Sequence, residues 1–144
     1  MMSQYYCCLP LCVVMAMAQG MVGCLNEAII DLDDLQKIVG GGGDISLYCP
    51  DLNFIEFCYK ETLRCFKSEL FVLGFEFNGV WKQNVSQLIS KLSDRLEYFT
   101  LRLNASTGCQ RCEIYDEKSA EIFLGNLRRL LQYLNRFSCS RLQL

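Results

Sequence analysis

The stretch TGCQRCEIYDEKSAEIFLGNLRRLLQYL, residues 107–134, decides the fold of this chain. With a step of 100° per residue, its apolar side chains fall on one side of a helix. This stripe consists of Ala120, Phe123, Leu127, Leu130 and Leu134, flanked by Leu124 and Leu131. Acidic residues crowd the first turns and arginines the last turns, which suits the helix macrodipole. Cys109 and Cys112 precede the stripe at CxxC spacing. The stretch therefore predicts an amphipathic helix with two cysteines at its start, which need sulfur partners elsewhere.

Apolar periodicity predicts three earlier helices, at residues 25–39, 54–73 and 80–103. Glycines at 40–43 end the first of them. Cys58 and Cys65 lie seven residues apart, so on the second helix they would stack two turns apart, within reach of an adjacent CxxC. Together the pattern predicts an all-α chain, a short-chain four-helix bundle with up-up-down-down topology and two long connections, stapled by disulfides.

Composition narrows the class of function. The 144 residues have room for one domain, and a net charge of −2 without clustered Lys and Arg argues against a nucleic-acid surface. The chain has no histidine, which removes the commonest general base and the commonest metal ligand. No nucleophile–base pair, nucleotide motif or carboxylate constellation is visible, so we expect no enzyme, no cofactor and no small-molecule substrate.

The N-terminus indicates the compartment. Residues 5–18 form an apolar run that is too short to span a membrane and is typical of a signal peptide. Ala16-x-Ala18 and Val22-x-Cys24 both fit a cleavage site, so we expect a signal peptide at 1–24, cut between about 18 and 24, and a helical domain at 25–144. The charged n-region is missing, and a buried N-terminal helix or a signal anchor remains an alternative. Cleavage would leave an even set of cysteines: Cys49, Cys58, Cys65, Cys109, Cys112 and Cys139.

The residues also carry a resemblance to a known family. Gly-Cys-x-x-Cys-Glu at 108–113, Glu-x-Phe-Leu at 121–124 and the later Gln132 resemble the fourth helix of the interleukin-15 family. More broadly, the chain is similar to the interleukin-2, -15 and -21 group of four-helix cytokines. Earlier matching positions are Asp44, Leu47, Tyr48, Cys58, Cys65, Phe66, Glu69 and Leu70.

The resemblance implies two disulfides, Cys58–Cys109 and Cys65–Cys112. Cys49 and Cys139 remain as a pair, and parity alone suggests that they form a third bridge. Two alternatives use the same cysteines: a zinc site made by Cys58, Cys65, Cys109 and Cys112, and a redox-active CxxC. Asn84-Val-Ser86 and Asn104-Ala-Ser106 are glycosylation acceptors at Asn84 and Asn104 if the chain is secreted.

The resemblance further implies a secreted, monomeric ligand that binds alpha (sushi-type), beta and common gamma receptor chains and triggers Janus kinase and STAT signalling in lymphocytes. The family's alpha-chain contacts map to Tyr48, Glu69, Val72, Glu76, Glu113 and Glu117. Its beta-chain contacts map to Asp31 and Gln87, where Gln87 replaces an asparagine, and its gamma-chain contact maps to Gln132. By helical periodicity Asp31 faces away from the core. The alternatives are an interleukin-21-like or interleukin-2-like cytokine, a secreted helical protein without receptor activity, and a metal-bound intracellular protein.

Overall fold

A computed structural model describes residues 25–40, 44–52, 58–77 and 82–136, except for the side chains of 82–84. The signal peptide expected at 1–24 lies outside this part. The elements, in chain order, are α2 (Asn26–Val39), β1 (Ser46–Tyr48), α3 (Tyr59–Glu76), α4 (Lys82–Thr100), the 3-10 turn η2 (Cys112–Ile114), β2 (Glu117–Ser119) and α5 (Ala120–Leu134).

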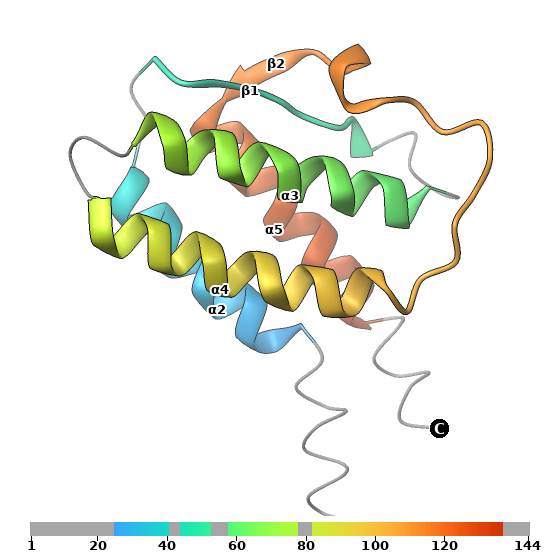
Figure 1. Ribbon diagram of the computed structural model, residues 1–144, viewed down its shortest axis with the longest axis horizontal. Helices are drawn as coiled ribbons and strands as arrows, with labels where there is room; N and C mark the ends of the chain where they lie inside the picture. Colours follow the sequence, from blue (N-terminus) through green and yellow to red (C-terminus); the bar gives the residue numbers. More distant parts are fainter. Residues whose placement is uncertain (1–24, 41–43, 53–57, 78–81, 137–144) are drawn as a thin grey trace, which may run out of the picture.

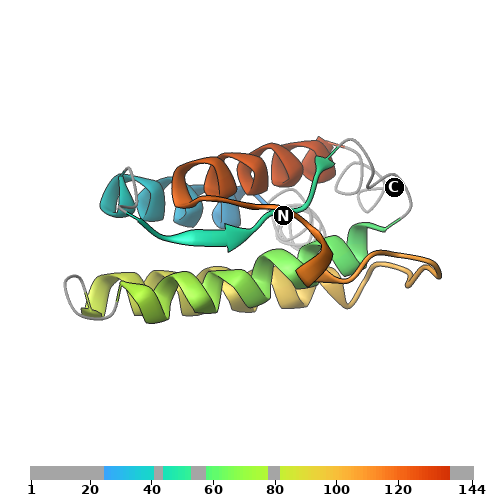
Figure 2. The ribbon, with the colours of Figure 1, turned by 90° about the horizontal axis from the view of Figure 1, so that it is seen from above.

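The four helices form the bundle that the sequence predicts. Figure 1 shows α2 and α3 running in one direction and α4 and α5 in the other, which is the up-up-down-down topology. The connections from α2 to α3 and from α4 to α5 each cross the length of the bundle. In Figure 2, α2 and α5 form one layer and α3 and α4 the other.

Apolar stripes from all four helices meet in one core. Phe66 of α3 and Phe123 of α5 are fully buried, and their ring centroids lie 5.1 Å apart. Around them pack leucines from every helix, such as Leu32, Leu92 and Leu127. Burial of this surface supplies the main stabilisation of the fold.

A two-stranded ribbon is the element that the sequence analysis did not predict. β1 and β2 pair antiparallel, with Leu47 opposite Lys118, although they are far apart in the chain. The ribbon lies across the gap between α3 and α5 (Figure 2). Ile45, Leu47 and Cys49 alternate with polar or half-buried neighbours, and this period of two is the signal that could have revealed β1.

The ribbon shifts the start of the last helix. We expected Cys109, Cys112 and the acids after them to stand at its first turns, but α5 begins only at Ala120. Ser119 caps it, because its Oγ accepts a hydrogen bond from the backbone N of Ile122 at 3.3 Å. The chain between Cys112 and Ser119 forms η2 and β2 instead, since their backbone groups bond within the turn and to β1.

The second helix also differs from its predicted bounds. Residues 54–57 lie outside the described part, and Cys58 is the residue before α3 rather than part of it. The helix continues through Gly74 to Glu76. The missing side chain of Gly74 leaves room for α4. A Cβ at Gly74 would lie 2.9 Å from Ile89 Cδ1. α4 ends at Thr100, three residues before its expected end.

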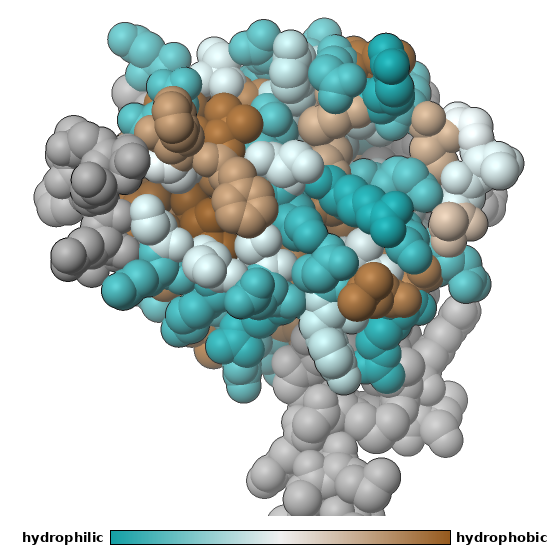
Figure 3. Space-filling view, viewed as in Figure 1, coloured by the Kyte–Doolittle hydropathy of each residue, from teal (hydrophilic) through white to brown (hydrophobic). Residues whose placement is uncertain are grey.

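The outer surface of α3 and α4 is largely hydrophilic. Figure 3 shows hydrophobic side chains gathered over the region where α3 ends and α4 begins. Among the described helices, none combines the length and the apolarity that a membrane span requires.

Candidate functional site

Two disulfides fix the side of the bundle that carries the ribbon (Figure 1). Cys58 bonds to Cys109 with an S–S distance of 2.04 Å, and Cys65 of α3 bonds to Cys112 of η2 at 2.00 Å. These are the two pairs that the resemblance implies. Each bridge ties α3 to the connection between α4 and α5, and so holds the segment that leads into β2.

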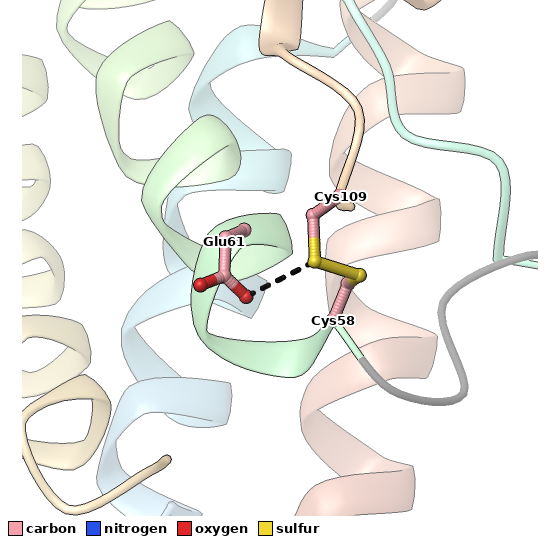
Figure 4. Close-up of side chains that lie close together, drawn as sticks. All are labelled: Cys58, Glu61 and Cys109. Carbon is pink, nitrogen blue, oxygen red and sulfur yellow. Dashed lines mark hydrogen bonds between the residues drawn. A yellow bond between two sulfur atoms is a disulfide. The ribbon is translucent and has the colours of Figure 1, made fainter. Parts of the chain in front are cut away.

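The Cys58–Cys109 bridge has an acidic neighbour. Glu61 of α3 accepts a hydrogen bond from the Ser106 backbone N at 3.3 Å, and its Oε1 lies 3.5 Å from Cys109 Sγ (Figure 4). The three side chains are close enough to surround an ion. Zinc needs thiolates, however, and sulfurs that are bonded to each other offer none. The same argument removes the four-cysteine zinc site, and because Cys109 and Cys112 bond to Cys58 and Cys65 rather than to each other, they do not form the disulfide of a redox-active CxxC.

Cys49 contradicts the predicted third bridge. Its thiol is free and buried, and the Asn126 Nδ2 of α5 lies 3.1 Å from Sγ. Burial raises the pKa of the Cys49 thiol, although the amide of Asn126 opposes this, so the neutral form is favoured. The even number of cysteines was not enough to predict a bridge at Cys49, because this residue packs under the ribbon, against α5. Cys139 lies outside the described residues.

Glu69 is not the exposed contact that we expected. Only 8% of its surface is exposed, and its Oε1 accepts a hydrogen bond from the Tyr48 backbone N at 2.7 Å. Burial raises the pKa of Glu69; the Tyr48 hydrogen bond lowers it, and the nearby Glu117 and Glu113 raise it further. The carboxylate therefore pins β1 onto α3, and the ribbon covers it.

The other members of the expected alpha-chain surface lie on η2, on the ribbon and on the α3 face that carries Glu69. Glu113 of η2, Glu117 of β2 and Glu76 of α3 are exposed, and Tyr48 is half-buried. Val72 of α3 is 39% exposed, and Ile114 of η2 is 60% exposed. We call Tyr48, Val72, Glu76, Glu113 and Glu117 the ribbon patch. The ribbon patch is an acidic surface that includes one apolar side chain, Val72. The buried Glu69 supports it through the hydrogen bond that it accepts from the Tyr48 backbone.

Asp31 also departs from its predicted environment. It is 5% exposed, and its carboxylate accepts a 2.8 Å hydrogen bond from Arg95 Nε of α4. Lys91 Nζ lies 3.6 Å from its other oxygen, and Arg95 also pairs with Glu27. Asp31 therefore joins α2 to α4 instead of facing away from the bundle.

A groove between α2 and α4 lies beside this network. It has a volume of about 470 Å³ and is lined by Asp34, Lys37, Ile38, Gln87, Leu88 and Lys91. Gln87, the second expected beta-chain contact, is exposed at its edge. Ile30 of α2 is 58% exposed. The groove combines an apolar floor with charged and amide groups, which is the usual make-up of a recognition surface.

Gln132 keeps the position that the sequence predicts. It is exposed on the outer face of α5, with Gly125 two turns earlier. A Cβ added at Gly125 would meet nothing within 4 Å, so space lies open above this helix. Tyr133 is 39% exposed, and its OH lies 3.3 Å from that of Tyr59. Arg128 instead bonds Asp33 of α2 at 2.6 Å, and this bond lowers the pKa of Asp33.

The two expected glycosylation acceptors differ in setting. Asn104 is exposed in the connection after α4. Asn84 lies within α4, and its side chain is outside the described part.

Sequence reasoning missed Lys91 and Arg95, the α4 residues that bind Asp31. A signal existed: Glu27 and Asp31 are four residues apart on α2, and Lys91 and Arg95 are four apart on α4. Two facing helices with i, i+4 pairs of opposite charge can neutralise each other.

Comparison with known families gives one match. The model of the family described as Interleukin 15 matches residues 5–135 of the 144. The matched range includes all four helices, the ribbon and both disulfides. No curated protein matches the chain.

Proposed function

Since this chain belongs to the interleukin 15 family, and is thereby a cytokine, we propose that it is secreted and signals by bringing alpha, beta and common gamma receptor chains together. The cytoplasmic tails of the receptors then activate Janus kinases and STAT factors in lymphocytes. The ligand performs no chemistry, and its contribution is geometric. The two disulfides in the described part of the chain support an oxidising, extracellular setting for residues 25–144 after removal of the signal peptide.

The observation that carries this proposal is the separation of three exposed surfaces on one stapled bundle. The ribbon patch lies on α3 and the ribbon, the Gln87 groove between α2 and α4, and Gln132 on the outer face of α5. Three partners could therefore bind at once without competing for the same residues.

The ribbon patch suits a basic alpha chain. Glu76, Glu113 and Glu117 are exposed carboxylates, so association should slow as salt rises. Glu69 takes no direct part, because β1 covers it. Its role is to hold Tyr48 and the ribbon in place.

The Gln87 groove is the proposed beta-chain site. Its apolar floor, Ile38 and Leu88, would accept an apolar side chain of the receptor, and Gln87 can both donate and accept at the edge. Asp31 supports this site indirectly, because its ion pairs fix the spacing of α2 and α4.

A panel of purified alpha, beta and common gamma ectodomains tests the proposal. Glu76→Lys/Glu117→Lys should weaken alpha binding alone, Gln87→Ala beta binding alone, and Gly125→Leu gamma binding alone. Glu121→Lys, on an exposed residue of α5 outside the ribbon patch, is the charge control for alpha binding. Binding to a different receptor set of the group would make the chain interleukin-2-like or interleukin-21-like, and a folded protein that binds none of the three would refute receptor activity.

A further inference from the structure

We propose that a second surface on α3 and α4 docks a segment of a partner protein that carries carboxylates and a bulky apolar side chain. The surface, here called the α3 stripe, consists of Lys60, Arg64, Lys67, Phe71 and Phe75 with the hollow beside the two phenylalanines. It belongs to none of the three receptor surfaces described above.

The stripe follows from the spacing of its residues. They lie at i, i+4, i+7, i+11 and i+15, which places them within about 80° of one another on a helix with 100° per residue. Its ends are 15 residues apart, or about 22 Å along the axis. Val72 and Glu76 of the ribbon patch lie about 100° and 140° from the centre of the stripe, although Val72 is only about 60° from Phe75, so the two surfaces adjoin at this end of α3. The centre of the stripe still faces a different direction from the ribbon patch.

The C-terminal half of the stripe is apolar and unusually exposed. Phe71 is 55% and Phe75 is 79% exposed, and a hollow of about 400 Å³ lies beside them. The hollow is lined by Phe71, Gly74, Phe75, Ser86 and Ile89. It exists because Gly74 has no side chain and lets Ile89 approach the α3 backbone. Figure 3 shows this hydrophobic area over the ends of α3 and α4. Exposed apolar areas beside polar ones commonly mark interaction sites.

The N-terminal half of the stripe is basic. Glu97 of α4 pairs with Lys67, and the pKa of Glu97 is lowered by this bond and by the charges of Lys67, Arg64 and Lys60. The charges of three cations thus act on one carboxylate, although the whole chain carries −2. Arg64 is exposed on the outer side of α3. Because Glu97 carries one negative charge, it does not balance all three cations, and the remaining positive charge favours an acidic partner.

The order of basic and apolar side chains along the stripe indicates which kind of partner segment would bind it. A helix of about 15 residues, or an extended segment of about seven, would span it, with carboxylates toward Lys60 and Arg64 and an apolar side chain in the hollow. An open hollow between two helices can still accept one bulky side chain. A lipid surface needs no such hollow, so the geometry favours a protein segment. Aromatic and arginine side chains are also the types that dominate protein interfaces.

Selection from a phage-displayed library of random peptides against the disulfide-bonded protein tests this proposal. The main class of binders should combine Asp or Glu with a bulky apolar residue. In fluorescence anisotropy, Phe75→Ser should weaken such a peptide by about tenfold or more, and Arg64→Glu by a smaller factor that shrinks at high salt. Ile122→Ser and Arg136→Glu remove an exposed isoleucine of α5, in the other layer of the bundle, and an exposed arginine near the end of α5, and should leave Kd within about twofold. Circular dichroism checks that each variant is folded.

Four results would overturn the proposal. The binders could be basic, or could bind the Phe75→Ser protein as well as the wild type. The wild type, but not Phe75→Ser, could bind phosphatidylserine vesicles while no acidic peptide binds, which would make the stripe a lipid surface. It could also dimerise through Phe75 in sedimentation equilibrium, which would make the occupant a second copy.

Discussion

Gln132 on the outer face of α5, Asp31 on α2 and Glu69 on α3 were all expected to be accessible contact residues, and they turned out differently. Gln132 is exposed, as helical periodicity indicates. With the 100° step, Gln132 lies about 150° from the centre of its stripe, whereas Asp31 and Glu69 lie only about 60–80° from the centres of theirs, on the flanks of α2 and α3, and they are 5% and 8% exposed. Each of the two buried acids has a partner from another segment: Arg95 for Asp31 and the Tyr48 backbone for Glu69.

The difference teaches what a helical wheel omits. A wheel describes one helix against the core and contains nothing about a second element packed against its flank. α4 covers the flank of α2, and β1 covers the flank of α3, whereas no described element covers the outer face of α5 at Gln132. An acid at a covered flank then acts as a structural group, because a buried charge needs a partner.

Among changes at the covered flanks, we expect the largest loss of stability from removal of the Cys65–Cys112 bridge, which ties α3 to the segment that leads into β2. Cys65→Ser/Cys112→Ser opens a loop with a sequence separation of 47. The chain-entropy treatment predicts a loss of about 4 kcal/mol in unfolding free energy, as an upper value. Guanidinium denaturation measures it, and the ribbon patch should lose alpha-chain binding as well.

The matched control is Cys49→Ser, which changes a buried cysteine that closes no loop. We expect it to cost less than half as much. Equal losses in the two variants would mean that thiol packing, rather than loop closure, stabilises this side of the bundle.

The next effect concerns Asp31. Asp31→Ala leaves Lys91 and Arg95 without their carboxylate, and should lower the unfolding free energy by about 1–3 kcal/mol. The cost stays below that of a fully buried pair because the Lys91 side chain is 57% exposed and can be hydrated. Thermal unfolding followed by circular dichroism measures it.

Asp34→Ala, on an exposed acid of the same helix, is the control and should change stability by less than about 0.5 kcal/mol. If Asp31→Ala were as harmless as Asp34→Ala while beta binding fell, Asp31 would be a free contact, as the wheel suggested.

The sequence predicts those features that depend on local pattern. The stripe of α5, the order of the helices and the pairing of Cys58 and Cys65 with the CxxC follow from periodicity, spacing and family likeness. The β1–β2 ribbon does not, because its strands are three residues each and pair across the chain. Its existence moved Glu113 and Glu117 off the helix and buried Glu69. The ion pairs of Asp31 likewise depend on the facing of α2 and α4, which no single segment encodes.

Glu69 should give a smaller effect that depends on pH. Its pKa is raised above the usual 4.5, so the folded state binds the proton more tightly than the unfolded state. Its charged form therefore costs stability at pH 7, and this cost disappears as pH falls through the raised pKa to below 4.5.

Glu69→Gln keeps an acceptor for Tyr48 N and should raise stability at pH 7 by on the order of 1 kcal/mol, and not at pH 4. Urea denaturation at both pH values decides this, with the exposed Glu113→Gln as control. A destabilised Glu69→Gln at pH 7 would show that the charge itself is needed.

The smallest effect on stability belongs to Gln132, where the uncovered side of the comparison is tested. Gln132→Ala removes an exposed amide from α5 and should change the unfolding free energy by less than about 0.5 kcal/mol. A receptor that buries this amide would keep unpaired groups after its loss, at about 1–3 kcal/mol, so gamma-chain affinity should fall by roughly 5- to 150-fold. The open space above Gly125 is what allows a receptor backbone to come this near. Alpha binding should survive, because the ribbon patch lies on other elements. Gln110→Ala removes an exposed amide from the connection before η2 and serves as the control. A folded Gln132→Ala protein that recruits the gamma chain and signals at wild-type potency would mean that exposure on α5, although correctly predicted, does not identify the contact.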